Sequence, residues 1–130
     1  GDVLAQFASG LGWPWGMTFD TEADDLWVNS IGVAVGGTDD DNHRFLRDGT
    51  NTGDAITPAW MAVFVGDGTY DPFSNTIWQV NVGGDNCIYE SDPLTLAPTG
   101  MSICPAFGTS MRGLAYDPVT DTFYAGSWND

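Results

Sequence analysis

A hairpin unit that occurs three times constrains the fold of this chain more than any other feature. Each copy has a short apolar segment that ends in an aromatic residue and Asp, then a turn, then an apolar pair at a fixed distance after the Asp. The copies are residues 16–28, 68–80 and 113–125. A unit that recurs along one chain is typical of repeat architectures. The sequence therefore predicts several small sheets built to one design.

Short apolar segments between Gly, Pro and Asp residues predict further strands after the first two hairpins. Third strands are expected at 42–48 and 86–92, which share an opening Asn, a central aromatic residue and a closing Asp. Fourth strands are expected at 55–60 and 101–104, and a short strand is expected at 3–7. No window sustains apolar residues at helical spacing. We therefore expect an all-β chain of four-stranded antiparallel sheets.

Three segments resemble strands of known β-propellers: residues 113–118 (GLAYDP), 77–80 (IWQV) and 88–93 (IYESDP). They are similar to the first, second and third strands of blades in secreted bacterial and archaeal propellers of the YVTN, NHL and virginiamycin B lyase-like groups. The resemblance implies twisted four-stranded blades whose first strands line a central channel. It also implies that the Trp and Tyr residues of the second strands pack between neighbouring sheets.

The resemblance divides the chain into about two full blades with partial blades at both ends. Residues 1–12 would be the last strand of a preceding blade, 13–60 the first blade, 61–110 the second, and 111–130 the first half of a third. A closed propeller needs at least four blades. We therefore expect association with other copies of the chain or with the remainder of a longer chain. The lack of an initial Met and of a signal-peptide pattern favours a start inside a longer precursor.

The charge of the chain is strongly negative and excludes several partners. Eighteen acidic residues face three Arg and no Lys, which gives a net charge of −15. Such a field repels nucleic acids and anionic membranes, and no apolar run has the length of a membrane-spanning helix. The acidity suits a saline medium or divalent cations. Because Asp is also a common turn residue, it equally suits a chain made of strands and turns.

Cys87 and Cys104 fall on the predicted third and fourth strands of one blade. Neighbouring strands bring two Cys residues close enough for a disulfide, and the even number of Cys favours one. A disulfide would indicate an extracellular or cell-surface location. Two buried free thiols or a metal pair are the alternatives, although the single His43 disfavours a Cys/His zinc site.

An acidic loop offers oxygen ligands of the kind that calcium prefers. The candidate ligands are Asp39, Asp40, Asp41 and Asn42. The loop lacks the spacing of an EF-hand, so an exposed acidic loop without metal is the alternative. No cofactor is required by the sequence, and calcium is the candidate. The hairpin residues Asp20, Asp71 and Asp117 are interpreted as turn-forming rather than catalytic.

Four Trp residues lie near predicted loops or strand ends, where they could stack on the ring of a glycan: Trp13, Trp15, Trp60 and Trp128. Packing between blades is the alternative for these side chains. The end of the last hairpin is the expected assembly edge, where a partner or further chain would attach. It consists of Ser127, Trp128 and Asn129.

The sequence contains no recognisable catalytic motif. It has one His and no Lys, and it lacks a Gly-x-Ser-x-Gly elbow, an HExxH motif and a phosphate-binding loop. Its many carboxylates leave acid–base chemistry on a sugar, by a hydrolase or lyase, as the least favoured interpretation. We therefore expect a non-enzymatic extracellular module that has a structural or interaction role. A propeller that binds a glycan or calcium is the alternative.

Overall fold

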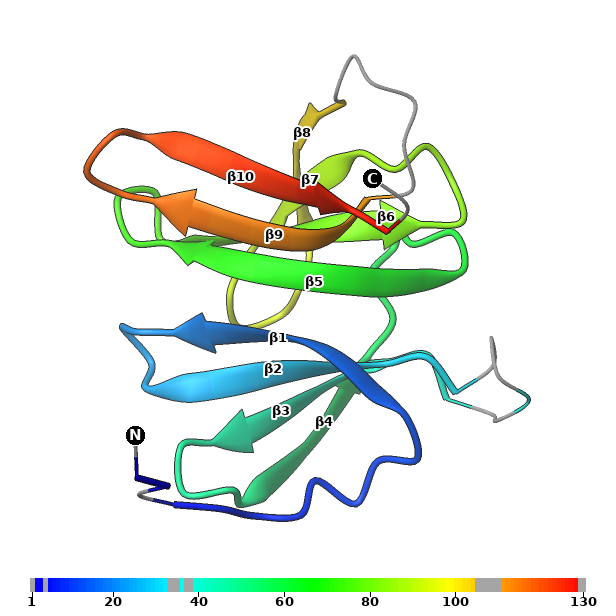
Figure 1. Ribbon diagram of the computed structural model, residues 1–130, viewed down its shortest axis with the longest axis vertical. Helices are drawn as coiled ribbons and strands as arrows, with labels where there is room; N and C mark the ends of the chain where they lie inside the picture. The colour runs from blue at the N-terminus through cyan, green and yellow to red at the C-terminus, as the bar shows by residue number, and fades with distance from the viewer. Residues whose placement is uncertain (1, 4, 33–35, 37–38, 105–110, 129–130) are drawn as a thin grey trace.

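The computed structural model describes residues 2–3, 5–32, 36, 39–104 and 111–128, which form ten β-strands and no helix. Eight strands form two four-stranded antiparallel sheets, in the orders β1-β2-β3-β4 and β5-β6-β7-β8, and the last two form a hairpin. The prediction of an all-β chain with four-stranded antiparallel sheets is confirmed. The sheets made by these residues do not close into a ring (Figure 1).

The strands keep the order of the three predicted hairpin units. The first sheet contains β1 (Pro14–Asp20), β2 (Asp25–Ser30), β3 (Asn42–Leu46) and β4 (Asn51–Ile56). The second sheet contains β5 (Phe64–Asp71), β6 (Thr76–Val82), β7 (Ile88–Ser91) and β8 (Pro98–Ile103). The third sheet contains β9 (Met111–Asp117) and β10 (Thr122–Ser127).

The predicted positions of the fourth strands and of the first short strand are wrong in part. β4 begins at Asn51, before the predicted 55–60, and β8 begins at Pro98, before the predicted 101–104. Both are exposed edge strands, held by backbone hydrogen bonds to one neighbour, so their side chains need no apolar alternation. The described residues of 3–7 form no strand, and Phe7 instead stacks on Phe45 with ring centroids 6.1 Å apart.

The turns of the three hairpins are built in the same way. The carboxylates of Asp20, Asp71 and Asp117 each accept a hydrogen bond from the backbone amide two residues later, at 2.8, 2.9 and 2.9 Å. The residue four positions after each Asp has a positive φ, and these residues are Asp24, Asn75 and Asp121. Asp and Asn adopt this left-handed conformation more readily than other residues that carry a side chain. The three carboxylates are therefore turn-forming, as predicted.

The first strands of the three sheets, β1, β5 and β9, lie side by side and run in the same direction (Figure 1). Gly16 permits the closest approach, because a Cβ at this position would lie 2.0 Å from the carbonyl oxygen of Gly66. The Asp67 carboxylate accepts hydrogen bonds from the amides of Met17 on β1, at 3.3 Å, and Leu114 on β9, at 3.2 Å. One side chain of β5 thus connects the first strands of all three sheets.

Two apolar clusters fill the spaces between neighbouring sheets. The cluster between the first and second sheets contains Trp27, Tyr70, Ile77 and Leu96, with Ile56 at its border. The cluster between the second and third sheets contains Trp78, Val80, Val82, Ile88, Met111 and Leu114, with Phe64 and Phe123 at its border. Trp27 of β2 and Trp78 of β6 therefore pack between sheets, as the resemblance implied. The expectation is wrong for Tyr124 of β10, which is exposed because β9 is its one partner among the described strands.

Cys87 and Cys104 form a disulfide, as predicted. The two residues lie directly before β7 and directly after β8, so the bond joins the open ends of this hairpin. Because they are the two Cys residues of the chain, the alternatives of free thiols and of a Cys metal pair do not apply.

The part of the chain that the structure describes contains no helix of the length and apolarity needed to cross a lipid bilayer.

Candidate functional site

The second strand of the third sheet, β10, differs in burial from its counterparts β2 and β6. Five of the six residues of β2 and all seven of β6 are buried, whereas none of the six residues of β10 is buried. β2 and β6 are each flanked by a strand on both sides, and β10 pairs with β9 alone among the described strands. The same position of the repeat is therefore core in two sheets and surface in the third.

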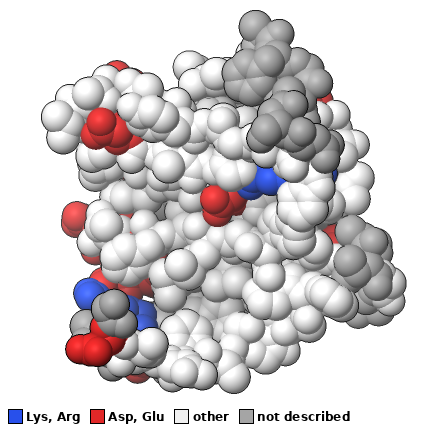
Figure 2. All heavy atoms as spheres, viewed as in Figure 1, with Lys and Arg blue, Asp and Glu red and all other residues white. Residues whose placement is uncertain are grey.

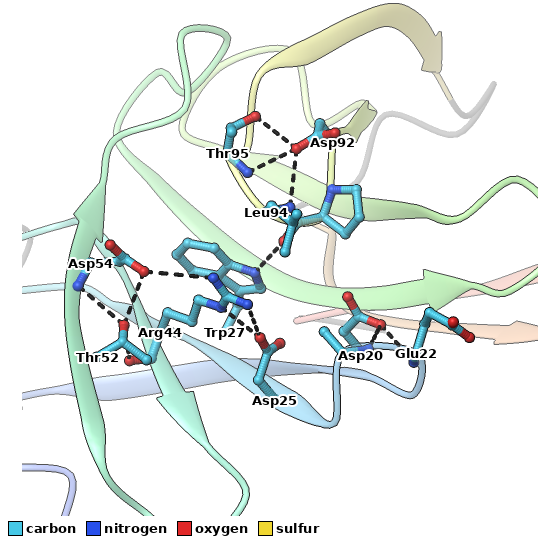
Figure 3. A network of polar contacts seen from close by, with 12 residues as sticks. Asp20, Glu22, Asp25, Trp27, Arg44, Thr52, Asp54, Asp92, Leu94 and Thr95 are labelled. Atoms are coloured by element: carbon cyan, nitrogen blue, oxygen red, sulfur yellow. Dashed lines mark hydrogen bonds and ion pairs between the residues drawn. The ribbon is translucent and has the colours of Figure 1, made fainter.

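Trp27, Trp78 and Tyr124 occupy the equivalent position in the three second strands. The indole Nε1 of Trp27 donates a hydrogen bond of 2.8 Å to the carbonyl oxygen of Pro93 in the β7–β8 turn (Figure 3). Trp78 is also buried and lies 5.0 Å from the ring of Phe123, but its Nε1 has no hydrogen-bond partner among the described residues. Tyr124 is 60% exposed.

The partner of Trp27 explains this difference. Pro93 belongs to the turn that follows the third strand of the next sheet, and the described part of the third sheet has only first and second strands. Trp78 therefore has an apolar neighbour across the contact but no turn that supplies a carbonyl. A buried indole N–H without a partner is unfavourable, since the hydrogen bond that it makes with water in the unfolded chain is not replaced.

Two of the predicted sugar-stacking residues, Trp15 and Trp128, lie in contact with each other. Their ring centroids are 5.4 Å apart, and Trp15 also meets the edge of Phe64 at 6.4 Å. Trp15 and Trp128 remain 42% and 61% exposed. Trp13 is also exposed and lies two residues before Trp15 in the chain.

Trp60 lies apart from this group. Its ring stacks on Tyr89 at a centroid distance of 5.0 Å and an angle of 6°. Its Nε1 donates a hydrogen bond of 3.0 Å to the Ser91 hydroxyl. These contacts give Trp60 a packing role against β7.

Arg112 lies over the ring of Phe64, which in turn contacts Trp15. Its guanidinium carbon is 5.6 Å from the centroid of the Phe64 ring, and its Nη1 donates a hydrogen bond to the backbone oxygen of Met111. Arg44 and Arg47 both form ion pairs, whereas Arg112 forms none with a carboxylate of the described residues. Partial burial lowers the pKa of Arg112. The face in Figure 2 is mostly uncharged, with acidic atoms in small separate groups.

The assembly edge predicted at the end of the last hairpin lies at this same place. Ser127 is the last residue of β10 and pairs with Met111, and Trp128 follows it. Asn129 lies outside the described residues. The predicted edge and the exposed Trp pair are therefore neighbours in the structure.

The predicted calcium ligands make separate contacts within the protein. Asp39 pairs with His43 at 2.7 Å and accepts a hydrogen bond from the amide of Asp41. The Asp41 carboxylate accepts a hydrogen bond from the hydroxyl of Thr57. Asn42 is buried, and its side-chain nitrogen donates to the Ile56 backbone oxygen at 3.3 Å. These contacts hold the loop against β3 and the segment after β4.

No group of three carboxylate, His or Cys ligands within 4.8 Å of one another includes the acidic loop, as far as the described residues show. Among all the described residues, the one group of this kind is Asp85, Cys87 and Cys104. Its two sulfur atoms are joined in the disulfide and are not free to bind a metal. Calcium binding by the acidic loop therefore stays a prediction.

A second charged group, shown in Figure 3, has a structural role. The buried Asp25 carboxylate accepts a hydrogen bond of 2.5 Å from Arg44 Nε, and Arg44 also lies 3.7 Å from Asp54. The guanidinium carbon is 6.0 Å from the centroid of the Trp27 ring. The pair supplies an opposite charge to a buried carboxylate, which would otherwise be unfavourable, and covers one side of Trp27.

Sequence reasoning missed Asp67, Phe64 and Arg112. A signal for Asp67 was present in the repeat, because Gly16 and Gly113 occupy its position in the other two hairpin units. A charged residue at a repeat position that is Gly in the other two units indicates a specific contact. Phe64 and Arg112 carry no such signal, since their importance comes from neighbours distant in the chain.

No protein-family model matches this chain, and no curated protein sequence matches it. The resemblance to propellers rests on the segments of this sequence alone.

Proposed function

We propose that this chain is a non-enzymatic, extracellular interaction module of propeller-type blades that associates through the open edge of β10. The observation that carries the proposal is the contrast in burial between β10 and its counterparts β2 and β6. The partner strand would come from another copy of the chain or from a further part of a longer chain.

The chemistry of β10 favours strand addition. An edge strand presents unpaired backbone N–H and C=O groups, which form a template for another strand. Tyr124 adds an exposed aromatic side chain to this edge. A strand and turn placed there, as β7 and its turn are placed in the second sheet, would cover Tyr124 and bring a carbonyl oxygen to Trp78 Nε1. Strand addition would thus satisfy the buried donor as well as the edge.

Several features support a propeller-type arrangement of the sheets. The first strands lie side by side in the same direction, with Gly16 at their closest approach and Asp67 bonded to both neighbours. Large aromatic side chains of the second strands fill the spaces between sheets. The disulfide supports an extracellular or cell-surface location, since such bonds persist in oxidising compartments.

Sedimentation velocity over a wide range of protein concentrations tests the self-association. We expect the wild-type chain to associate as the concentration rises and Tyr124→Lys to remain a monomer, because an edge Lys disfavours strand pairing. Val119→Lys is the matched control: it adds the same charge at a 91% exposed position in the turn before β10 and should behave as wild type. A folded wild-type monomer at all concentrations contradicts self-association.

A peptide tests the second source of the partner strand. Residues 42–48 contain β3, the third strand of the first sheet, and this is the kind of strand that would follow β10 in a longer chain. If the chain is a monomer, this peptide should bind the wild type and not Tyr124→Lys, as measured by calorimetry. Absence of both self-association and peptide binding would overturn the proposed function.

A further inference from the structure

We propose that Trp15, Phe64, Arg112 and Trp128, called here the aromatic cluster, bind an acidic sugar. In this proposal a pyranose ring stacks on the exposed Trp side chains, and the carboxylate of the sugar pairs with Arg112. Sugar binding at this cluster is separate from the proposed association and does not require a strand on β10. The proposed ligand is a short oligosaccharide that carries uronic acid units.

The exposed Trp pair supplies the apolar part of the site. Trp15 and Trp128 come from opposite ends of the chain and pack together at 5.4 Å, yet about half of each side chain stays open to water. Exposed apolar patches of this kind mark interaction sites, because they are otherwise unfavourable on a protein surface. The C–H face of a pyranose ring is apolar and flat, so it complements an indole. Phe64 supports Trp15 from its edge.

Arg112 supplies the charged part of the site. The chain contains 18 acidic residues and three Arg residues. Arg44 and Arg47 form ion pairs, whereas the Arg112 guanidinium forms none with the described carboxylates. One N–H donates to the Met111 backbone oxygen, which leaves other donors of the guanidinium for a ligand. A guanidinium matches a carboxylate with two parallel hydrogen bonds. The contact with Phe64 joins this charge to the Trp pair.

The charge of the whole chain limits the size of the ligand. A net charge of −15 repels a long polyanion such as a nucleic acid or a heavily sulfated chain. A short sugar acid that carries few carboxylates meets less repulsion and still pairs with Arg112. A neutral sugar would use the Trp pair but leave the guanidinium without its complement. The exposed Trp pair together with the one cation, Arg112, therefore favours a short oligouronate as the ligand.

The test is a titration of the wild-type chain with trigalacturonate, its neutral counterpart galactotriose, and triglutamate. Tryptophan fluorescence and calorimetry give the affinities. We expect trigalacturonate to bind with a Kd of about 0.1 to 1 mM, and galactotriose and triglutamate to bind at least about tenfold more weakly. No saturable binding of trigalacturonate at about 10 mM would overturn the proposal. Equal binding of galactotriose or of triglutamate would overturn the acidic-sugar class.

Variants assign the binding to the aromatic cluster. Arg112→Gln should weaken the affinity for trigalacturonate by roughly tenfold, because it removes one charge-assisted contact. The affinity for galactotriose should stay unchanged. Trp128→Ala should weaken the binding of both sugars. Trp60→Phe, at a separate place in the structure, is the matched control and should weaken the binding of neither sugar. Near-ultraviolet circular dichroism confirms that each variant is folded. Unchanged trigalacturonate affinity in both Arg112→Gln and Trp128→Ala would overturn the proposal.

Discussion

The contact between the first and second sheets and the contact between the second and third sheets use the same design with different partners. Trp27 and Trp78 are equivalent residues and both are buried. Among the described residues, however, only the Trp27 indole has a hydrogen-bond partner, which is the carbonyl oxygen of Pro93. Apolar packing of the indole thus needs only the neighbouring hairpin. Its polar atom needs the turn after the third strand. A hairpin alone therefore buries the Trp of the neighbouring sheet but does not supply an acceptor for its indole N–H.

The two contacts also differ in how closely the first strands approach. Gly16 and Gly113 are equivalent residues of β1 and β9. A Cβ at Gly16 would lie 2.0 Å from the Gly66 carbonyl oxygen, whereas the nearest atom to a Cβ at Gly113 is the Gly126 Cα, at 4.0 Å. The position is therefore tightly constrained in the first sheet and open in the third.

The largest expected effect comes from the disulfide that closes the open end of the β7–β8 hairpin, whose turn contains Pro93. The double variant Cys87→Ala/Cys104→Ala should lose about 3 kcal/mol of unfolding free energy, because the bond closes a loop of 17 residues in sequence separation. Urea denaturation measures the loss. Reduction of the wild type should reproduce it, while the reductant should leave the double variant unchanged. A loss much below 1 kcal/mol would show that the ends of β7 and β8 are held by other contacts.

The Gly pair tests the difference in approach. Gly16→Ala should cost about 2 to 3 kcal/mol of unfolding free energy, since the added methyl group meets backbone that has to move. Gly113→Ala should change stability by less than about 0.5 kcal/mol, and it serves as the matched control. Equal effects in urea denaturation would contradict the tighter contact assigned to the first strand.

The Trp pair tests the hydrogen bond alone. Trp27→Phe and Trp78→Phe remove similar ring volume, but only Trp27→Phe also leaves a carbonyl oxygen, that of Pro93, without its donor. We expect Trp27→Phe to cost about 1 kcal/mol more than Trp78→Phe. Thermal or urea unfolding of both variants gives the difference. A larger loss for Trp78→Phe would mean that its indole N–H is satisfied in solution.

The smallest expected effect is a pH dependence in the third sheet. Burial and the hydrogen bond to Asp121 raise the pKa of Tyr116, on β9, to about 12. An unfolded Tyr ionises near pH 10. Between these values the folded chain keeps a proton that the unfolded chain loses, so stability falls as the pH rises from about 10 to 12. This contribution is fully present below about pH 10.

Tyr116→Phe tests this dependence. The variant should show a shallower decline of the urea midpoint above about pH 10 than the wild type, because it lacks the shifted group. Phe19 occupies the same place in the first sheet and shows that the substitution fits the repeat. An ultraviolet titration in which Tyr116 ionises near pH 10 would refute the shift.

The hairpins were predictable from the sequence because their turns carry local chemistry. Asp at the start of each turn and Asp or Asn at the left-handed position recur in all three copies, as at Asp71 and Asn75. The disulfide was predictable because it joins neighbouring strands of one sheet. These features depend on residues close together in the chain or in one hairpin, so a sequence pattern records them.

The edge strands and the aromatic cluster were not predictable in the same way. β4 contains Thr52, Gly53 and Asp54, which are typical of a turn, yet its pairing with β3 requires only backbone groups. Trp15 and Trp128 meet because three first strands lie side by side. The sequence identified both Trp residues as candidates. It held no information that Trp15 meets both Trp128 and Phe64, since these contacts depend on how separate sheets pack.

Hydrogen exchange of the backbone amides of β10, measured by mass spectrometry at low and high protein concentration, tests whether β10 is an open edge that pairs with a strand of another copy. We predict that β10 exchanges much faster than β2 and β6 at low concentration and gains protection at high concentration, while β2 and β6 stay unchanged. This result would follow if β10 is an open edge that pairs with a strand of another copy. Amides of β10 that are as slow as those of β2 and β6 at low concentration, or that gain no protection while the chain associates, would contradict the account.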